Sequence, residues 1–416
     1  MINRCITIGI VSTLFVSGYV FFKQPFEFYI SYFVIIILLP LFIFKFPFPT
    51  SVIKILLPLL LLGLVSVYVG NNTLPLLLKI FINLFVSILF YNYVFQFYEF
   101  NIITIVKYYM IGAFMVASIG IIQVISFHIG FVKGYDFSWI FNKWGFYPGG
   151  LLGIRINSVF TEPSYFGASM APAFFISIYS IFFRKNLFLK KYMHVIIIIT
   201  YFSTSSTVAF AGILFSILLL LVNIGFVRYL VVFVPILLFA YMYIYNSTPE
   251  FRMRMDGLSK LYSGEAVNAF EVHGSSFVQY NNFHVALENF QRNPFFGTGL
   301  GSHPVAYEHY SLVKEFGGIY DFNNLDANSM FLRLMSETGL YGLLLIMIFI
   351  VKFFVVRKKD NSNELYWIIS SAALIVILLQ LFRQGNYTYN GFMFYMWLYY
   401  YTCVAEKKFR ISKKIS

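Results

Sequence analysis

The sequence predicts an all-α protein that crosses a membrane many times. Its 416 residues are 59% hydrophobic and only 11% charged, whereas a soluble globular domain carries about 25% charged residues. Apolar runs recur at lengths near the roughly 20 residues that an α-helix needs to cross a bilayer. The run at 31–44 does not alternate between apolar and polar positions, and this argues against an outer-membrane β-barrel.

Twelve apolar segments are the predicted spans. The least regular stretch is 192–222, where the hydroxyl-rich segment 203–207 interrupts the run and its side chains can satisfy a turning backbone within lipid. We interpret this stretch as two short spans, because a single span would put two basic clusters on opposite sides of the membrane. The predicted spans are residues 6–22, 26–44, 51–69, 74–95, 107–127, 163–183, 192–204, 207–222, 229–245, 329–355, 365–382 and 387–404.

The net charge of +13 follows from this topology. With both termini in the cytoplasm, nearly all of the excess of Lys and Arg falls on cytoplasmic segments and span ends, as the positive-inside rule requires. A basic surface for nucleic acid is therefore not needed to explain the charge, and no nucleic-acid partner is expected. The predicted location is a membrane that the chain crosses several times, with both termini on the cytoplasmic side.

The spans divide the chain into three parts. Residues 1–245 hold nine predicted spans and an external segment at 128–162, residues 246–328 form a large external loop, and residues 329–416 hold three more spans and a basic cytoplasmic tail. Within the large loop, Phe283, Leu287 and Phe290 recur at helical spacing before a Pro- and Gly-rich stretch, which predicts a helix and its end. We expect a partly helical cap over the membrane core.

Polar residues at the membrane edge are the first candidates for chemistry. Glu162 precedes Pro163 at the predicted start of a span, where the helix dipole stabilises a carboxylate. Arg155 lies seven residues earlier. The pair is either a helix cap with an ion pair, or the lining of a cavity that receives an anionic group, because ionisable groups at membrane depth are costly enough to suggest function.

Other candidates lie in or near the large loop. Arg252 and Arg254 are either a phosphate clamp or interfacial anchors, and His303 is either a general base or an ordinary buried histidine. The glycine-rich turn 297–301 lacks the context of a dinucleotide site, and its backbone is expected to approach another group closely, with an anion as one option. Neither the histidine spacing nor the two cysteines predicts a metal site.

Four segments together resemble the bacterial O-antigen polymerases of the O-antigen ligase/polymerase superfamily. They are "RINSVFTEPSYFG" from Arg155, "STSSTVAF" from Ser203, "ALENFQRNPFFGTGLGS" from Ala286 and "NSMFLRLMSETGLYGLL" from Asn328. The resemblance implies a metal-independent, cofactor-free glycosyltransferase with a multispanning, GT-C-like fold. It implies undecaprenyl-diphosphate-linked oligosaccharides as substrates at the periplasmic face, contact with membrane lipids, and a flippase and a chain-length co-polymerase as partners.

Departures from the ligase pattern favour the polymerase branch. The spacing of Asn328, Ser329, Gly339 and Gly342 fits a ligase signature in which a histidine stands where this chain has Asn328. An arginine common before the third segment corresponds to Gln279. The alternatives are an O-antigen ligase that transfers glycan to lipid A–core, and a polysaccharide transporter or flippase.

The resemblance and the residues together suggest roles. Arg155, Arg252 and Arg254 are expected to contact the diphosphate or nearby glycan charge. Glu162 is the expected base, with His303 as the alternative. The remaining substrate-binding candidates are Asp326 and Asn328, which would orient sugars, and Tyr165, Arg333 and Arg383.

Overall fold

The computed structural model describes residues 2–22, 27–225, 230–247, 249–265, 272–315, 318, 321–388 and 391–415. Over these residues the regular secondary structure is helical, and extended pairing is limited to two isolated bridges, Val20 with Tyr29 and Pro148 with Ile154. The predicted all-α class is therefore confirmed for the described part of the chain.

Among the residues that the structure describes, seven helices are long and apolar enough to cross a membrane. They are α3 (Thr50–Val69), α4 (Leu74–Phe97), α5 (Ile102–His128), α7 (Pro163–Phe182), α9 (Thr207–Ile224), α14 (Met330–Phe353) and α15 (Glu364–Arg383). This finding supports a polytopic helical membrane protein. The count of twelve spans stays a prediction.

The other predicted spans correspond to three shorter helices, α1 (Ile2–Phe15), α2 (Ile30–Lys45) and α8 (Lys191–Ser203), to α10 (Leu230–Ser247), and to α16 (Phe392–Ile415), whose C-terminal half is charged. Outside the predicted spans lie α6 (Val132–Tyr135), α11 (Pro249–Ser263), α12 (Gly274–Arg292) and α13 (His303–Tyr310). The last three lie in the large loop, which is partly helical as the sequence indicates.

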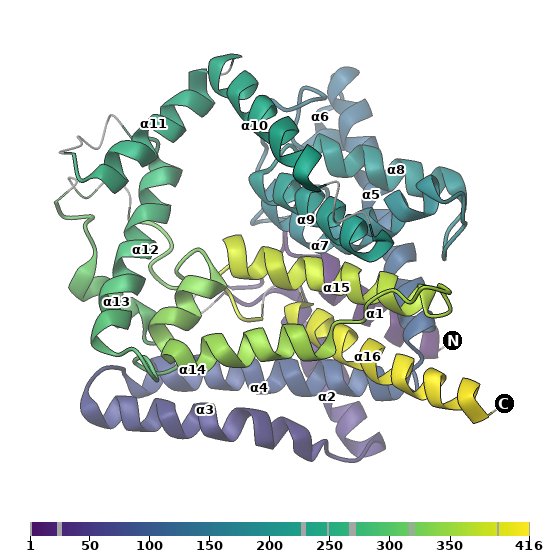
Figure 1. Cartoon of the computed structure of the whole chain (residues 1–416), viewed down its shortest axis with the longest axis horizontal. Coiled ribbons are helices and arrows are strands. Elements are labelled where there is room, and N and C mark those ends of the chain that lie inside the picture. The colour runs from purple at the N-terminus through teal and green to yellow at the C-terminus, as the bar shows by residue number, and fades with distance from the viewer. Residues whose placement is uncertain are drawn as a thin grey trace.

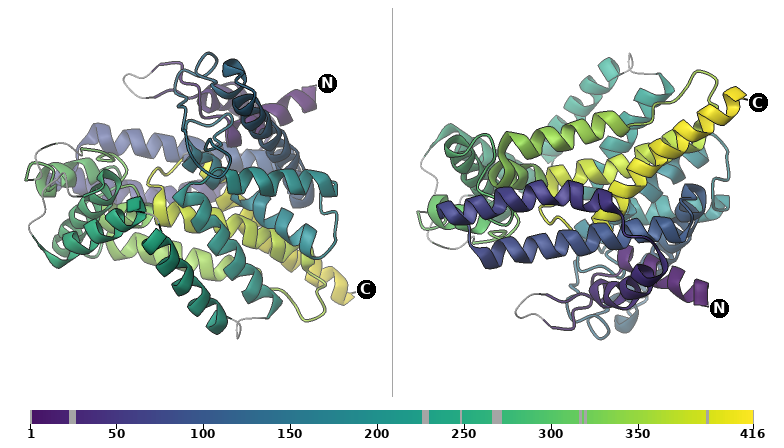
Figure 2. Two further views of the ribbon diagram at one scale, coloured as in Figure 1. Left: turned by 90° about the horizontal axis from the view of Figure 1, so that it is seen from above. Right: turned by 90° about the horizontal axis from the view of Figure 1, so that it is seen from below.

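The cap helices α11, α12 and α13 lie at one end of the helical bundle, and both termini lie at the other (Figures 1 and 2). We call these the cap end and the terminal end. Within the bundle, α7 and α15 are the most enclosed of these seven helices. Of the residues in their most apolar stretches, 78% and 72% are buried, compared with 22% for α3. Helices α7 and α15 therefore form the centre, and α3 lies at the edge.

Several predicted span ends differ from the helix ends in the structure, and the first and last spans differ clearly. The helix of the first span ends at Phe15 instead of running to residue 22, because the side chain of Asn142 pairs with both backbone groups of Val20 in extended chain. The last helix begins at Phe392 instead of residue 387 and continues to Ile415. Composition alone does not reveal that residues between a predicted span end and the observed helix end make loop contacts.

The expected break in 192–222 is present. Helix α8 ends at Ser203 and α9 begins at Thr207. The Thr204 hydroxyl donates to the carbonyl of Ile156 at 2.6 Å, and the Ser206 hydroxyl accepts from the Ala209 amide at 3.1 Å. The Ser206 hydroxyl therefore satisfies a backbone amide at the start of α9, as the sequence predicts, and the Thr204 hydroxyl joins the break to the loop at Ile156.

A second break divides α14 at Gly339, whose φ of 59° and ψ of −150° are not helical. A segment of the cap fills this break. The amides of Leu340 and Tyr341 donate to the carbonyls of Pro294 and Phe295, at 2.8 Å and 3.0 Å. In return, the Gly299 amide donates to the Glu337 carbonyl at 2.7 Å. Because a helix in lipid cannot leave backbone groups unpaired, the cap segment completes this span.

The conformation at Gly339 requires glycine for two reasons. This region of φ and ψ is essentially closed to residues with a side chain, and a Cβ atom there would lie 2.6 Å from the Pro294 carbonyl oxygen. On the other side of the contact, a Cβ atom at Gly297 would come equally close to the backbone of Glu337. The two backbones therefore meet with no room for a methyl group.

We expect Gly339→Ala to lower the melting temperature of the detergent-purified protein by several degrees, because it adds both strain and overlap. The matched control is Gly130→Ala, since Gly130 also has a positive φ, of 74°, but has open space around its Cβ position. Thermal unfolding of both variants is the measurement. Equal losses of stability in the two variants would contradict the proposed backbone contact.

Candidate functional site

A cavity of ≈ 480 Å³ lies at the cap end between two pairs of helices. Leu258 and Tyr262 of α11 and Gln279 and Phe283 of α12 form one wall. The first turn of α14 and the last turn of α15 form the other wall, with Phe331, Leu332, Leu378, Leu381, Phe382 and Arg383. The segment 327–329 joins the walls, so the cavity is largely apolar with a few polar groups.

Three positions that the sequence singles out meet in this cavity: Asn328, Gln279 and Arg383. Two cap or loop segments and one span contribute them. Asn328 stands where the ligase signature has a histidine, and Gln279 stands where an arginine is common. Both therefore line the same cavity, although they lie far apart in the sequence.

Asp326 shapes the turn that carries Asn328. Its carboxylate accepts from the Asn328 amide at 3.1 Å and from the side chain of Asn323 at 3.2 Å. Ala327 and Asn328 both have positive φ, of 57° and 56°, a conformation that asparagine tolerates better than alanine. Asp326 therefore supports the strained turn and is not itself a lining residue of the cavity.

Arg155, Glu162 and Tyr165 do not line the cavity. Glu162 is the N-cap residue of α7, and its carboxylate accepts from the Ser164 hydroxyl. Burial raises the pKa of the Tyr147 phenol, the Glu162 charge raises it further and the Arg155 charge lowers it, so Tyr147 lies near both. The Tyr165 amide bonds to the Glu162 carbonyl.

The expected ion pair between Arg155 and Glu162 is not formed in the described part of the chain. Arg155 is half-buried, and its Nε atom is buried without a hydrogen-bond partner among the described residues. Its side chain lies against Gly150, which also contacts Ser205 in the break between α8 and α9. The first two segments of the resemblance therefore pack together.

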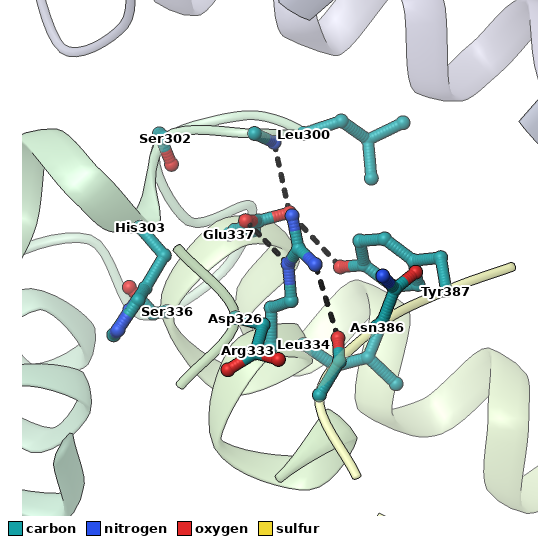
Figure 3. A network of polar contacts seen from close by, with 12 residues as sticks. Leu300, Ser302, His303, Asp326, Arg333, Leu334, Ser336, Glu337, Asn386 and Tyr387 are labelled. Carbon is teal, nitrogen blue, oxygen red and sulfur yellow. Dashed lines mark hydrogen bonds and ion pairs between the residues drawn. The ribbon is translucent and has the colours of Figure 1, made fainter. Parts of the chain in front are cut away.

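Arg333 and Glu337 form a buried ion pair one helical turn apart, at 2.9 Å. Figure 3 shows the network around this pair. Arg333 also donates to the Gly385 carbonyl at 3.0 Å and lies over the ring of Tyr387 at 4.3 Å. Glu337 accepts from the Gly301 amide at 2.8 Å and from the Tyr387 hydroxyl at 2.9 Å.

This network changes the expected role of Arg333. The side chain is 3% exposed and its charge is balanced inside the protein, so Arg333 joins protein segments and does not reach a substrate. Sequence reasoning missed Glu337. Its signal was an acidic residue inside a predicted span, four residues after an arginine, and such residues are costly unless paired.

The network also corrects the interpretation of the glycine-rich turn as an anion site. The Gly299 amide is taken by the Glu337 carbonyl and the Gly301 amide by the Glu337 carboxylate. The close approach that the glycines predict is real, but the partner is the broken helix α14 and not a diphosphate.

His303 is unsuited to act as the base. It is fully buried, and its Nε2 atom pairs with the side-chain oxygen of Asn282 at 3.1 Å. Burial, together with the charge of Arg333, lowers the pKa of His303 to about 3. A histidine of such low basicity that has no contact with solvent cannot take a proton from an acceptor hydroxyl efficiently.

Of the two candidate arginines of α11, the structure describes the side chain of Arg252 but not that of Arg254. The Arg252 guanidinium donates to the carbonyls of Tyr245 and Asn246 at 3.2 Å and 2.9 Å, and it lies 5.4 Å from the ring centre of Tyr245. It therefore caps the C-terminal end of α10, which supports the anchor interpretation.

The inward face of α12 is partly polar, and the apolar residues that indicated this helix are not its most buried ones. Phe283, Leu287 and Phe290 are only half-buried. The buried positions include Phe277, Val285 and three asparagines, Asn281, Asn282 and Asn289. Asn289 donates to the Ser336 carbonyl at 3.0 Å, so this helix packs by polar contacts that hydrophobic periodicity does not detect. Within the described chain, no cluster of His, Cys, Asp or Glu has the make-up of a metal site.

The bundle and its cap define a polytopic helical membrane protein with a cavity at one end. Residues 192–347 match the family model described as O-antigen ligase. This match supports membership of the O-antigen ligase/polymerase superfamily and covers the segment from α8 to most of α14. No curated protein matches the chain.

We expect Glu337→Gln to destabilise the protein by about 3–5 kcal/mol, because it leaves the Arg333 charge buried without its partner. The matched control is Glu288→Gln, which removes an exposed pair with Arg292 at the same helical spacing, worth about 0–1 kcal/mol. Thermal or chemical unfolding in detergent measures both. A loss no larger than that of the control would show that the buried pair is not required.

The low pKa of His303 predicts a pH dependence of stability. An unfolded histidine binds a proton near pH 6.5, whereas the folded protein does not until about pH 3. Between these values only the unfolded chain is protonated, so the free energy of unfolding falls as the pH falls. We expect His303→Gln to lose less stability than the wild type between pH 7.5 and pH 5, by about 2 kcal/mol.

The control for this measurement is His309→Gln, in the same helix but exposed. It should show the same loss of melting temperature on acidification as the wild type. A wild-type loss that is unchanged in His303→Gln would mean that His303 is protonated in the folded state.

Proposed function

We propose that this protein is a polysaccharide polymerase of the superfamily that residues 192–347 match. It would join undecaprenyl-diphosphate-linked oligosaccharide repeats at the periplasmic face of the inner membrane, by transfer of the growing chain to a hydroxyl of the incoming repeat. The observation that carries this proposal is the cavity at the cap end, which combines apolar walls with amide, phenol and guanidinium groups.

The composition of the cavity suits a lipid-linked glycan. Apolar side chains of α14 and α15 such as Phe331 and Leu381 can receive the first part of an isoprenoid chain. Arg383, at the last turn of α15, offers a cation for a diphosphate. Gln279 and Asn328 offer both donors and acceptors for sugar hydroxyls.

Asn328 favours polymerase over ligase. An asparagine side chain can orient a hydroxyl, but its amide is not basic near neutral pH. The base that the ligase-type signature supplies at this position is therefore missing. The ligase remains the second candidate, because the matching family model carries that description.

The reaction has simple requirements. An acceptor hydroxyl attacks the anomeric carbon of the donor sugar, the bond from that carbon to the diphosphate breaks, and undecaprenyl diphosphate leaves with the electron pair. The hydroxyl proton passes to a base, for which we propose Glu162. Because Glu162 does not line the cavity, this proposal requires the reacting sugars to extend beyond the cavity to the start of α7. Positioning and electrostatic stabilisation can supply most of the rate enhancement, and no cofactor or metal enters this proposal.

The proposed setting is a multi-pass protein with both termini in the cytoplasm and its cap in the periplasm, supplied by a flippase and regulated by a chain-length co-polymerase. Contact with membrane lipids follows from the exposed apolar surface of helices such as α3, where Leu61 and Val65 are more than half exposed.

Gel analysis of surface and lipid-linked glycans from a strain that lacks the protein tests this function. For a polymerase we expect the glycan ladder to collapse to core plus a single repeat, since ligation survives. Full-length glycan on undecaprenyl diphosphate together with bare core would instead identify a ligase. An unchanged ladder would exclude both.

The same strain, complemented with Glu162→Gln, tests the proposed base. We expect at least a hundredfold lower turnover, the usual scale for loss of a general base. Glu308→Gln, at an exposed position of α13, is the matched control and should restore the ladder. Near-normal turnover of purified Glu162→Gln would exclude Glu162 as the base.

A further inference from the structure

Tyr262 is an unusual residue for the wall of a cavity, because 61% of its surface is exposed. Two aromatic rings of α12 support it. Tyr280 lies edge-on with 5.2 Å between ring centres, and Phe283 lies 6.0 Å away. Its ring is thus held in place from α12 while most of its surface stays open.

Two amide side chains accompany this ring. Gln279 lies one helical turn before Phe283 on the same face of α12, and Asn328 lies on the segment that joins the two walls. Among the described residues neither amide group hydrogen-bonds to another part of the protein. Each amide therefore retains a donor and an acceptor side by side for a ligand.

Charge is unevenly distributed around the cavity. Arg383, on α15, is the charged residue of its described lining, while the wall formed by α11 and α12 contributes neutral groups. Burial raises the pKa of the Tyr262 phenol, and the neighbouring Tyr280 raises it further, so this hydroxyl stays neutral near pH 7. The described lining residues of the aromatic wall therefore offer an anionic sugar no cation.

We propose that Tyr262, Gln279 and Asn328 form a subsite for an uncharged pyranose ring of the lipid-linked repeat. A pyranose has an apolar face of C–H groups, which can lie on the Tyr262 ring, and a rim of hydroxyls, which the two amides can bind in pairs. This inference rests on the proposed function. It adds that the aromatic wall binds a sugar of the substrate.

With this subsite, the two walls of the cavity bind different parts of the substrate. The α14–α15 wall, with Phe382 and Arg383, takes the lipid and diphosphate end of the substrate, and the α11–α12 wall takes the sugar. Selectivity for the repeat therefore resides in the cap, whereas the lipid carrier is bound by the spans.

The test uses the purified full-length protein and the undecaprenyl-diphosphate-linked repeat extracted from the deletion strain. We expect Tyr262→Leu to raise the apparent KM about five- to tenfold with kcat changed less than twofold, because an aromatic contact is lost while the reacting groups remain. Tyr262→Phe keeps the ring and should stay within about twofold of the wild-type KM. Gln279→Leu should raise KM as well, without altering the aromatic contacts.

The matched control is Tyr68→Leu, which removes a tyrosine that is 93% exposed near the end of α3 and is outside the cavity. It should leave both kinetic constants unchanged. Melting temperatures of all variants separate a binding defect from misfolding, and if Tyr262→Leu does not fold, the KM of Gln279→Leu decides.

The outcomes for the subsite and for the function differ. If the wild-type protein forms no polymer from the extracted repeat, the proposed function fails. If the wild type polymerises but neither Tyr262→Leu nor Gln279→Leu raises KM, or if Tyr262→Phe is as impaired as Tyr262→Leu, the subsite is excluded. Mass spectrometry of the repeat that finds no uncharged pyranose would also exclude it.

Discussion

The buried pair of Arg333 and Glu337 is the interaction on which the cap end of the molecule depends. Neither charge could remain at this depth alone, and each uses its remaining atoms on a different part of the chain. Glu337 binds the Gly301 amide of the cap and the Tyr387 hydroxyl, and Arg333 binds the Gly385 carbonyl beyond α15. One helical turn of α14 thereby fixes both neighbouring segments.

The break in α14 joins the cap to this helix by backbone hydrogen bonds as well. Because Gly339 leaves the helix, the segment after Pro294 can replace the missing helical hydrogen bonds, and the cap becomes part of a span. The Ser329 hydroxyl also donates to the Leu381 carbonyl at 2.6 Å. These contacts hold the outer ends of α14 and α15 together, and the cavity lies between these ends and α11–α12.

This architecture separates residues that support the site from residues that face it. Buried groups such as Arg333 and His303 are occupied by the protein, whereas Asn328, Gln279 and Tyr262 face the cavity. A polymerase that handles two lipid-linked substrates needs a rigid frame around an adaptable surface. The proposed division between a lipid-binding wall and a sugar-binding wall is consistent with that requirement.

The sequence by itself determined the helical membrane class, the break near Ser205, the helix in the cap and the close backbone approach at Gly297 to Gly301, because composition, periodicity and glycine content are local properties. The partners of these residues were decided by the tertiary structure. Arg333 and His303 look like functional groups along the chain, yet Glu337 and Asn282 occupy them, and Gln279 meets Asn328 although 49 positions separate them. Pairing of distant segments depends on packing, which no local pattern encodes.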